Sequence, residues 1–511
     1  KDLSTKILSE LETRCEGIEF VGKEIISYDG KSTMLIRGER WALKVSDEDP
    51  GHLVEYKKNE RVLQTLEKSK KDLDGLMLFF GGFSDRQYML TELPTIIVDC
   101  SPFSSRQIGF KNAVALAERY RTKFITASYG TDVPESVSAV KLDDLVEKVK
   151  LFSVIRKMKN SKLISIQDHD GINRIDQGTY YDIPTNDYDL NYPGRLKEYF
   201  GVEMIIVRSK ELNQEIAKVD DVEAEEIAEM WVEEATEVKN VGLHDIVRSA
   251  RLYLAIKALL NKYDADAITL DTATLFFRGY GSSAWLRPEQ KVNETFPLLI
   301  MELSKEYIQS CCQSHIDCLV TQMVGNYMTG GSGFTGDFLN DWEFDPTGAR
   351  PENVMIVAHC GAPITPHKNG RIPYLIRDHI FRSEAFGPEN TPTATTVKWP
   401  LGEVASIVKF DVYRKMVSVF TGIVLDGDSL YENFPNIICR NKIVIQIDDP
   451  EDCYMLPSNP AAGLFRQCDC WDIDHRHWGG HQVAFYGDLR RRIKHLTALI
   501  GFEVVDRDSG K

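Results

Sequence analysis

The stretch that decides the fold covers residues 304–362 and reads SKEYIQSCCQSHIDCLVTQMVGNYMTGGSGFTGDFLNDWEFDPTGARPENVMIVAHCGA. Its middle predicts a helix, because apolar residues recur there at three- and four-residue steps and form one stripe. The stripe consists of Ile316, Leu319, Val320, Met323, Val324, Tyr327 and Met328. Ser314 is a favourable N-cap, with Asp317 three positions on as in a capping box. Gly330 supplies the stop.

Polar residues stand directly before and after this predicted helix. Gln313 precedes it in the run Cys-Cys-Gln, and Asp337 follows it in the run Thr-Gly-Asp-Phe. Residues 353–359 then read as a short buried strand that ends at His359. A rigid scaffold delivers the side chains at the ends of its elements into a cleft. We therefore expect these polar residues to line a cleft.

Each candidate also has a structural interpretation that the sequence leaves open. Asp337 could be a turn residue that bonds its own backbone, and His359 could be a satisfied core histidine. Asp317 lies one helical turn beyond Gln313 and could act as a general base, although a capping role is the simpler interpretation. The run Gly331-Ser-Gly-Phe-Thr-Gly336 has the spacing of a dinucleotide fingerprint. It follows a helix rather than a strand, so we reject a nucleotide cofactor.

The first two-thirds of the chain alternate short apolar runs with amphipathic helical segments. This alternation predicts parallel sheets with helices on both faces. We predict an α/β fold with two doubly wound, Rossmann- or flavodoxin-like domains at residues 1–162 and 163–350, the second carrying Gln313 and Asp337. The polar stretch Asp168–Gly194 is a long loop, and loops of this length are often binding segments. Its tyrosines either stack on a sugar or hold the loop against the protein surface.

The character of the sequence changes near residue 350. Apolar or alternating runs at 403–410, 416–424 and 442–447 are separated by Gly, Asn and Asp turns. They predict an antiparallel, barrel-like region, and we assign residues 351–511 to a β-rich C-terminal domain that carries His359 and His481. A closing helix is expected near the end of this domain, capped by Asp488 and stopped by Gly501.

Bulk properties exclude several classes of partner. With 511 residues the chain is too long for one core. A net charge of −16 makes nucleic acid an unfavourable partner, and no apolar run is long enough to span a membrane. The 10 cysteines do not form a disulfide framework and suit reduced thiols, so we expect a cytoplasmic protein.

The order of the motifs resembles the L-fucose isomerase and L-arabinose isomerase superfamily. The shared features are a Cys-x-Ser-x-Ile-Asp run, a helix, Gly-Asp-Phe-Leu and then His-Cys-Gly, while GHQVAFYGD at residues 480–488 is similar to the last signature of that family. The resemblance covers most of residues 160–511 and is weaker before them. In those enzymes two carboxylates and a histidine hold Mn²⁺, and a proton moves between C1 and C2 of a sugar.

The resemblance also implies which residues form the site. Asp337 and His481 match family ligands, and His359 falls where the arabinose branch has a further histidine. Gln313 departs from the pattern, because the family has Glu there; an amide oxygen can ligate a cation but carries no charge. The implied site holds Mn²⁺ or another divalent metal through Asp337, His481, His359 and Gln313. Its catalytic candidates are Asp337, Gln313 and Asp317.

Three functions are compatible with these residues. The first is a metal-dependent intramolecular oxidoreductase that interconverts an aldose and a ketose, acting on a sugar like L-fucose, D-arabinose or L-arabinose. The second is a glycoside hydrolase or lyase on the same scaffold, in which Gln313 binds substrate. The third is a non-catalytic sugar-binding relative. The resemblance further implies a homo-oligomer, either a trimer or a hexamer.

Overall fold

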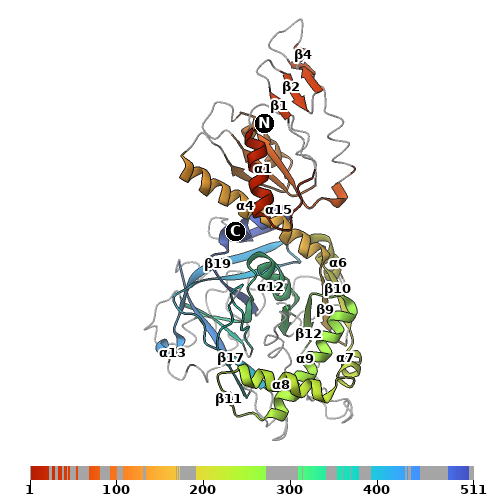
Figure 1. Cartoon of the computed structure of the whole chain (residues 1–511), viewed down its shortest axis with the longest axis vertical. Helices are drawn as coiled ribbons and strands as arrows, with labels where there is room; N and C mark the ends of the chain where they lie inside the picture. Colours follow the sequence, from red (N-terminus) through yellow and green to blue (C-terminus); the bar gives the residue numbers. More distant parts are fainter. Residues whose placement is uncertain are drawn as a thin grey trace. The chain divides into compact units, whose positions relative to one another are not determined.

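The structure is a computed structural model of the whole chain (Figure 1). It describes residues 2–21, 26–28, 33–36, 39–42, 44–45, 53–55, 68, 70–80, 92–100, 108–129, 134–168, 170, 172, 191–271, 309–312, 315–340, 354–359, 361–368, 370–378, 393–431, 434, 439–448 and 481–505. The chain separates into two compact units. Unit 1 combines Lys1–Arg156 with Arg492–Phe502, and unit 2 combines Lys157–Arg491 with Glu503–Lys511.

Unit 1 contains a three-stranded parallel sheet in the order β6-β7-β8. The central strand is buried along its whole length, as expected for a parallel strand covered on both faces. Helix α3 packs on this sheet, and Ala113 and Ala117 meet Ile97 in a small buried cluster. The elements are α1 (Asp2–Arg14), β1 (Ile26–Tyr28), β2 (Thr33–Ile36), β3 (Glu39–Ala42), β4 (Lys44–Val45), β5 (Leu53–Glu55), η1 (Lys70–Asp72), β6 (Leu76–Phe80), β7 (Thr95–Asp99), α3 (Ile108–Arg119), β8 (Phe124–Ser128), α4 (Glu135–Asn160) and α15 (Arg490–Ile500).

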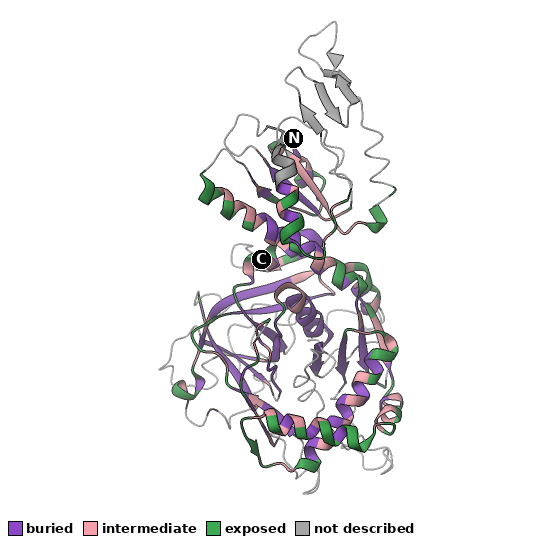
Figure 2. Cartoon of the chain, viewed as in Figure 1, coloured by how far each residue is buried: buried purple, intermediate pink, exposed green. Residues whose placement is uncertain are grey.

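Unit 2 begins with a four-stranded parallel sheet in the order β10-β9-β12-β13. Helix α8 packs on α9, and most of its acidic residues are exposed, as the green turns of this helix in Figure 2 show. The elements are β9 (Lys162–Ile166), α6 (Tyr192–Phe200), β10 (Glu203–Val207), α7 (Ser209–Ile216), α8 (Asp221–Glu234), α9 (Leu243–Tyr263), β12 (Ala267–Leu270), β13 (Gln309–Cys312) and α12 (Ile316–Thr329).

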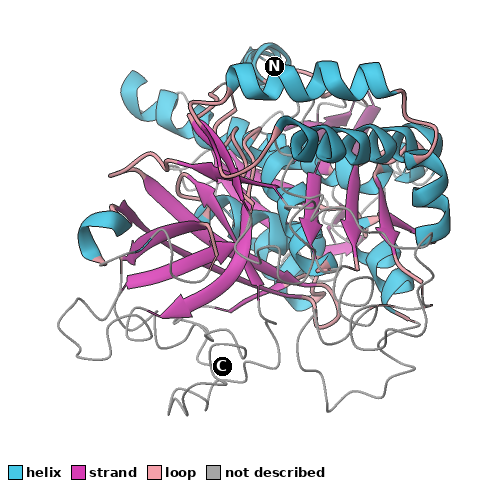
Figure 3. Cartoon of the chain, turned by 90° about the horizontal axis from the view of Figure 1, so that it is seen from below, coloured by secondary structure: helices cyan, strands magenta, loops and turns pink. Residues whose placement is uncertain are grey.

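The second half of unit 2 is a closed antiparallel barrel. Strands β18, β21, β14, β15, β20 and β19 pair in this order, and pairing of β18 with β19 closes a six-stranded ring (Figure 3). Closure removes the exposed edges that an open sheet would leave. The strands are β14 (Phe334–Asn340), β15 (Val354–His359), β18 (Val404–Asp411), β19 (Met416–Leu425), β20 (Asn441–Ile447) and β21 (His481–Tyr486).

Short elements complete unit 2. Strand β22 (Glu503–Val505) runs parallel to the start of β19. A separate three-stranded sheet has the order β11-β16-β17. The remaining elements are β11 (Val238–Lys239), β16 (Tyr374–Asp378), β17 (Thr393–Val397) and α13 (Gly427–Leu430).

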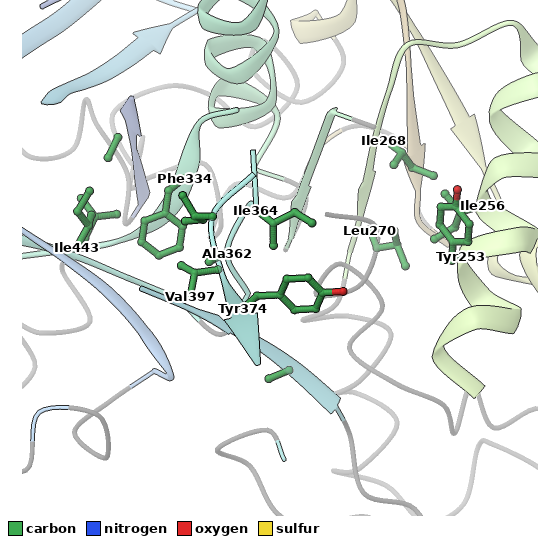
Figure 4. Close-up of a cluster of buried hydrophobic side chains, with 14 of the residues drawn as sticks. Tyr253, Ile256, Ile268, Leu270, Phe334, Ala362, Ile364, Tyr374, Val397 and Ile443 are labelled. Atoms are coloured by element: carbon green, nitrogen blue, oxygen red, sulfur yellow. The ribbon is translucent and has the colours of Figure 1, made fainter. Parts of the chain in front are cut away.

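One hydrophobic core joins the parallel sheet to the barrel. Figure 4 shows Ile268 and Leu270 beside Ile256 and Tyr253 of α9, with Ile364 and Phe334 farther toward the barrel. These buried residues belong to one continuous cluster. The sheet and the barrel are therefore held together by burial of apolar surface, the dominant favourable term in folding.

Helix α12 is the central element of unit 2, because it packs on β12 and β13 of the sheet and on β14, β18 and β21 of the barrel. The predicted helix is confirmed, and so is its stop, since Gly330 is the C-cap with φ +77°. The predicted capping box is wrong. The N-cap is His315 and makes no side-chain capping bond.

The observed architecture is a mixed α/β protein with parallel sheets and a closed barrel. The predicted barrel-like region is confirmed. Its first strand, β14, lies before residue 350, so the barrel contains strands from both sides of the predicted domain boundary. The division into three domains stays a prediction.

Candidate functional site

The candidate site is built on two neighbouring barrel strands. Asp337 of β14 and His481 of β21 are register partners in an antiparallel pair. Oδ1 of Asp337 lies 3.6 Å from Nε2 of His481, which is too long for a hydrogen bond and would be an ion pair only with a protonated ring. The structure thus brings together a carboxylate and an imidazole that lie far apart in the sequence. Both were predicted to be site residues.

The imidazole of His481 is buried with unused hydrogen-bonding capacity. Its residue exposure is 5%, and neither ring nitrogen has a hydrogen-bond partner among the described residues. Burial lowers the pKa of His481 well below 6.5, and the neighbouring His315, His359 and Lys409 lower it further. The ring is therefore neutral at physiological pH, which is the form that ligates metals. A buried polar group without a partner in the chain is uncommon in native proteins and calls for a specific role.

Two further histidines surround this ring. The centroid of the His315 ring lies 3.9 Å from that of His481, and the His359 centroid lies 5.5 Å from it. Burial lowers the pKa of His359 to about 4. The Gly361 backbone N–H donates to Nδ1 of His359 at 3.4 Å, so the neutral ring carries its proton on Nε2. In this tautomer His359 donates a hydrogen bond, and its role as a metal ligand stays a prediction.

A buried polar network supports His481 from behind. Nζ of Lys409 donates to the His481 carbonyl oxygen at 3.1 Å and to Sγ of Cys318 at 2.9 Å. Cys318 and Lys409 are both 0% exposed. Burial alone would raise the pKa of Cys318, but a hydrogen bond with Cys311 and the charge of Lys409 lower it overall. This network holds the backbone of His481 in place.

Asp317 is part of the same buried region rather than of a helix cap. Its carboxylate accepts hydrogen bonds from the Tyr192 hydroxyl and from the Val412 backbone N–H, the latter at 3.2 Å. Burial raises its pKa, although the charge of Lys409 opposes this shift. These contacts tie α12 to α6 and to the turn after β18. Its predicted catalytic role stays a prediction.

Several sequence candidates lie outside the described residues. These are Gln313, the side chain of Cys312, Cys360 and most of the loop that was expected at Asp168–Gly194; the last part of that stretch belongs to helix α6, which begins at Tyr192. Within the described part of the chain, Cys311 and Cys318 are buried and form no disulfide, as expected.

The residues present fit a divalent cation in donor chemistry. A carboxylate and a neutral imidazole with unused nitrogens are ligands that Mn²⁺ accepts. Among the described residues, however, no group of three or more His, Cys, Asp or Glu side chains has an arrangement that could hold a metal. Asp337 and His481 alone would therefore supply only two of the ligands that a metal site needs.

Sequence patterns gave little signal for several residues around this pair. Lys409 lies inside an apolar strand pattern, where a buried lysine is not expected. Gln482 is 0% exposed, and both ends of its amide lack a hydrogen-bond partner among the described residues. His315 stands directly before the predicted helix, next to Ser314, which is the residue type favoured at an N-cap. Only its position within the Cys-x-Ser-x-Ile-Asp run could have indicated a role for His315.

No family model and no curated protein matches this chain. In the described part of the structure, no helix combines the length and the apolar character needed to cross a membrane.

Proposed function

We propose that this protein is a metal-dependent sugar isomerase of the L-fucose and L-arabinose isomerase type, which interconverts an aldose and a ketose. One observation carries the proposal: Asp337 and His481, the two positions that match family ligands, lie 3.6 Å apart, and the ring nitrogens of His481 are buried without hydrogen-bond partners among the described residues. A structural histidine in this position would normally have its nitrogens satisfied.

The residues of the chain have distinct parts in this proposal. Asp337 and His481 would hold a divalent cation such as Mn²⁺. When bound, the cation polarises sugar oxygens as a Lewis acid. Lys409 fixes the His481 backbone, and neutral His359 can donate a hydrogen bond from Nε2 to a substrate oxygen. Burial of His481 places its contacts in a region of low dielectric constant, where polar interactions are stronger than in water.

The same proposal includes the domain type, the oligomeric state, the cellular location and the partners of the protein. The two parallel sheets would belong to doubly wound domains. The chain would assemble as a homo-oligomer, a trimer or a hexamer, and would act in the cytoplasm on a small sugar without nucleic acid or a membrane as partner. Gln313 would contribute an amide oxygen where the family has a carboxylate.

Manganese binding tests the metal site directly. Titration of the purified protein with MnCl₂, followed by the electron paramagnetic resonance signal of free Mn²⁺, should reveal about one ion per chain. Asp337→Asn and His481→Gln should each weaken binding by about 10–100-fold or more, since even indirect partners of a metal contribute that much. Matched controls are Asp264→Asn and His244→Gln, whose side chains are 94% and 68% exposed.

Turnover distinguishes the three functional hypotheses. Incubation with L-fucose, D-arabinose and L-arabinose, followed by NMR, should show ketose formation that EDTA abolishes. Cleavage of a glycoside without ketose formation would favour the hydrolase or lyase. Sugar binding without turnover of either kind would favour a non-catalytic relative. The absence of both Mn²⁺ binding and ketose formation would rule out the isomerase.

A further inference from the structure

The imidazole ring of His481 has no hydrogen bond that fixes its direction. The torsion that turns an imidazole ring has a broad, roughly two-fold preference, so the side chain does not set the direction of its own nitrogens. In metal-binding histidines a hydrogen bond on the second nitrogen normally does so. Here neither ring nitrogen has a hydrogen-bond partner among the described residues, and Asp337 approaches Nε2 only to 3.6 Å. Contacts between neighbouring side chains are left to orient the ring.

His315 makes the nearer of the two ring contacts of His481. The centroids of the His315 and His481 rings are 3.9 Å apart, and their planes are 38° from parallel. The ring of His359 is farther away, at 5.5 Å, and its plane is 62° from that of His481. Edge-to-face contacts hold aromatic centroids farther apart than 3.9 Å, so the face of His315 covers a face of His481. A flip of the His481 ring would have to pass through the space that His315 fills.

His315 is itself held in place at the start of α12. It is 2% exposed, and its carbonyl oxygen accepts a hydrogen bond from the Leu319 backbone N–H at 2.9 Å. Two positions later, the carboxylate of Asp317 accepts hydrogen bonds from the Tyr192 hydroxyl and from the Val412 backbone N–H. The start of the helix is therefore tied to two other segments of unit 2. A ring on this turn is a rigid surface for its neighbour.

The same turn of α12 also holds the backbone of His481. Sγ of Cys318 donates to the His481 carbonyl oxygen at 3.4 Å. Cys318 follows His315 by three positions, a spacing that places two residues on one side of a helix. A single turn of α12 thus contacts the backbone of His481 through Cys318 and its ring through His315.

The residue type at the start of α12 departs from local helix preference. Ser, Thr, Asp and Asn are favoured at an N-cap, because their side chains accept a hydrogen bond from the first turn. The N-cap here is His315, and its side chain makes no capping bond. Natural proteins break such local rules mainly at functional or strained sites. The contact of this side chain with His481 is a reason for the departure.

We infer that His315 is a positioning residue for His481: its ring covers one face of the His481 imidazole and keeps Nε2 directed at Asp337. The inference rests on the proposed function for the metal that His481 would bind. The ring contact itself is a property of the metal-free protein, so it can be tested separately. Ligands held in their binding orientation before the metal arrives lose less freedom on binding.

Manganese affinity separates the ring of His315 from its nitrogens. His315→Ala should weaken Mn²⁺ binding about tenfold or more, because partners that orient a ligand contribute about 10–100-fold to metal affinity. His315→Phe keeps a flat ring and removes both nitrogens, so it should recover most of the lost affinity. Val324→Ala deletes buried apolar atoms farther along the same helix. It should lower stability and leave the Mn²⁺ affinity unchanged.

Nuclear magnetic resonance tests the ring contact without any metal. Labelling the 11 histidines with ¹³C at Cε1 gives one signal per ring, and the signal that disappears in His481→Gln belongs to His481. At alkaline pH, where the imidazoles are neutral, the ring current of His315 should displace this signal from that of exposed His244. In His315→Ala the signal should move back and broaden, because the ring gains freedom. In Val324→Ala it should stay sharp and displaced.

Three results would overturn the inference. An unchanged His481 signal in folded His315→Ala would show that the contact does not position the ring. Equal loss of Mn²⁺ affinity in His315→Phe and His315→Ala would show that a nitrogen of His315 is needed instead of its ring. An equal change of the His481 signal in Val324→Ala would show an effect of general packing.

Failure of the positioning role and failure of the isomerase can be told apart. If the wild type binds no Mn²⁺ and forms no ketose, the proposed function fails, while the His481 signal of the metal-free protein still decides the role of His315. If the wild type forms ketose and His315→Ala leaves the signal unchanged, the isomerase stands and the positioning role fails. If His315→Ala does not fold, the wild-type signal decides, and a His481 signal without ring-current displacement overturns the inference.

Discussion

Nζ of Lys409 lies 2.9 Å from Sγ of Cys318, and neither side chain is exposed to solvent. Burial alone would lower the pKa of Lys409, but the charges of Cys318 and Asp317 raise it overall, so the amine stays protonated. A buried ammonium is tolerated only when its neighbours satisfy it. Lys409 therefore acts as a fixed positive charge directly behind His481.

Lys409→Met should be strongly destabilising. The substitution leaves Asp317 buried without its compensating charge, and breaking a buried pair costs about 3–5 kcal/mol of unfolding free energy. Urea denaturation measures the loss, and exposed Lys398→Met is the matched control. The double variant Asp317→Asn/Lys409→Met should cost less than the sum of its single changes. Additive costs would show that the two charges do not interact.

His359 should make stability depend on pH. Its pKa falls from 6.5 to about 4 on burial, so between these values the unfolded state binds more protons than the folded state. Stability is then fully present above pH 6.5 and is lost as the pH falls toward 4, by up to about 3 kcal/mol from this group. In metal-free protein, His359→Gln should flatten the curve in this range. The control is His244→Gln, which changes the same residue type at an exposed position.

Two helical glycines should respond oppositely to alanine. A Cβ at Gly325 of α12 would lie 2.2 Å from the buried ring of Phe485, whereas one at Gly194 of α6 meets nothing within 4 Å. Gly325→Ala should destabilise by about 1–3 kcal/mol through overpacking. Gly194→Ala should stabilise by up to about 1 kcal/mol through helix propensity. Thermal melts of both variants check the pair, and a stabilising Gly325→Ala would contradict the close approach of α12 to β21.

Gln313→Glu tests the departure from the family pattern. The substitution adds a carboxylate of nearly equal size, and general-base participation contributes about 10²–10⁴-fold in rate. We expect tighter Mn²⁺ binding and a gain of ketol-isomerase activity of roughly tenfold or more. Loss of a native activity, with metal content unchanged, would instead mean that the amide is required. The protein's own chemistry would then differ from isomerisation.

Local patterns predicted the elements of this protein well. The apolar stripe of α12, the stop at Gly330 and the alternating strands of the barrel all follow from side-chain periodicity and backbone preferences, which are properties of neighbouring residues. The predicted capping box is wrong because contacts between residues far apart in sequence override the local pattern. Asp317 has the right spacing for a cap, but Tyr192 and Val412, remote in sequence, engage its carboxylate instead.

The candidate site was predictable only in part. Asp337 and His481 could be paired through the resemblance, because motifs carry order along the chain. Lys409 could not, since a lone lysine in an apolar strand has no distinguishing pattern. Its contacts with Cys318 and His481 depend on strand order and register, which join segments far apart in sequence.

The interleaving of the two units has a consequence for synthesis. Residues 492–502 complete unit 1, yet they follow nearly all of unit 2 in the chain. Within this segment Ile493, Leu496 and Leu499 are buried. During translation the amino-terminal part of unit 1 therefore remains without residues 492–502 until residues 157–491 of unit 2 have been synthesised. A fragment that ends at residue 156 should expose apolar surface and bind chaperones, and supplying 492–502 as a peptide should restore its compactness.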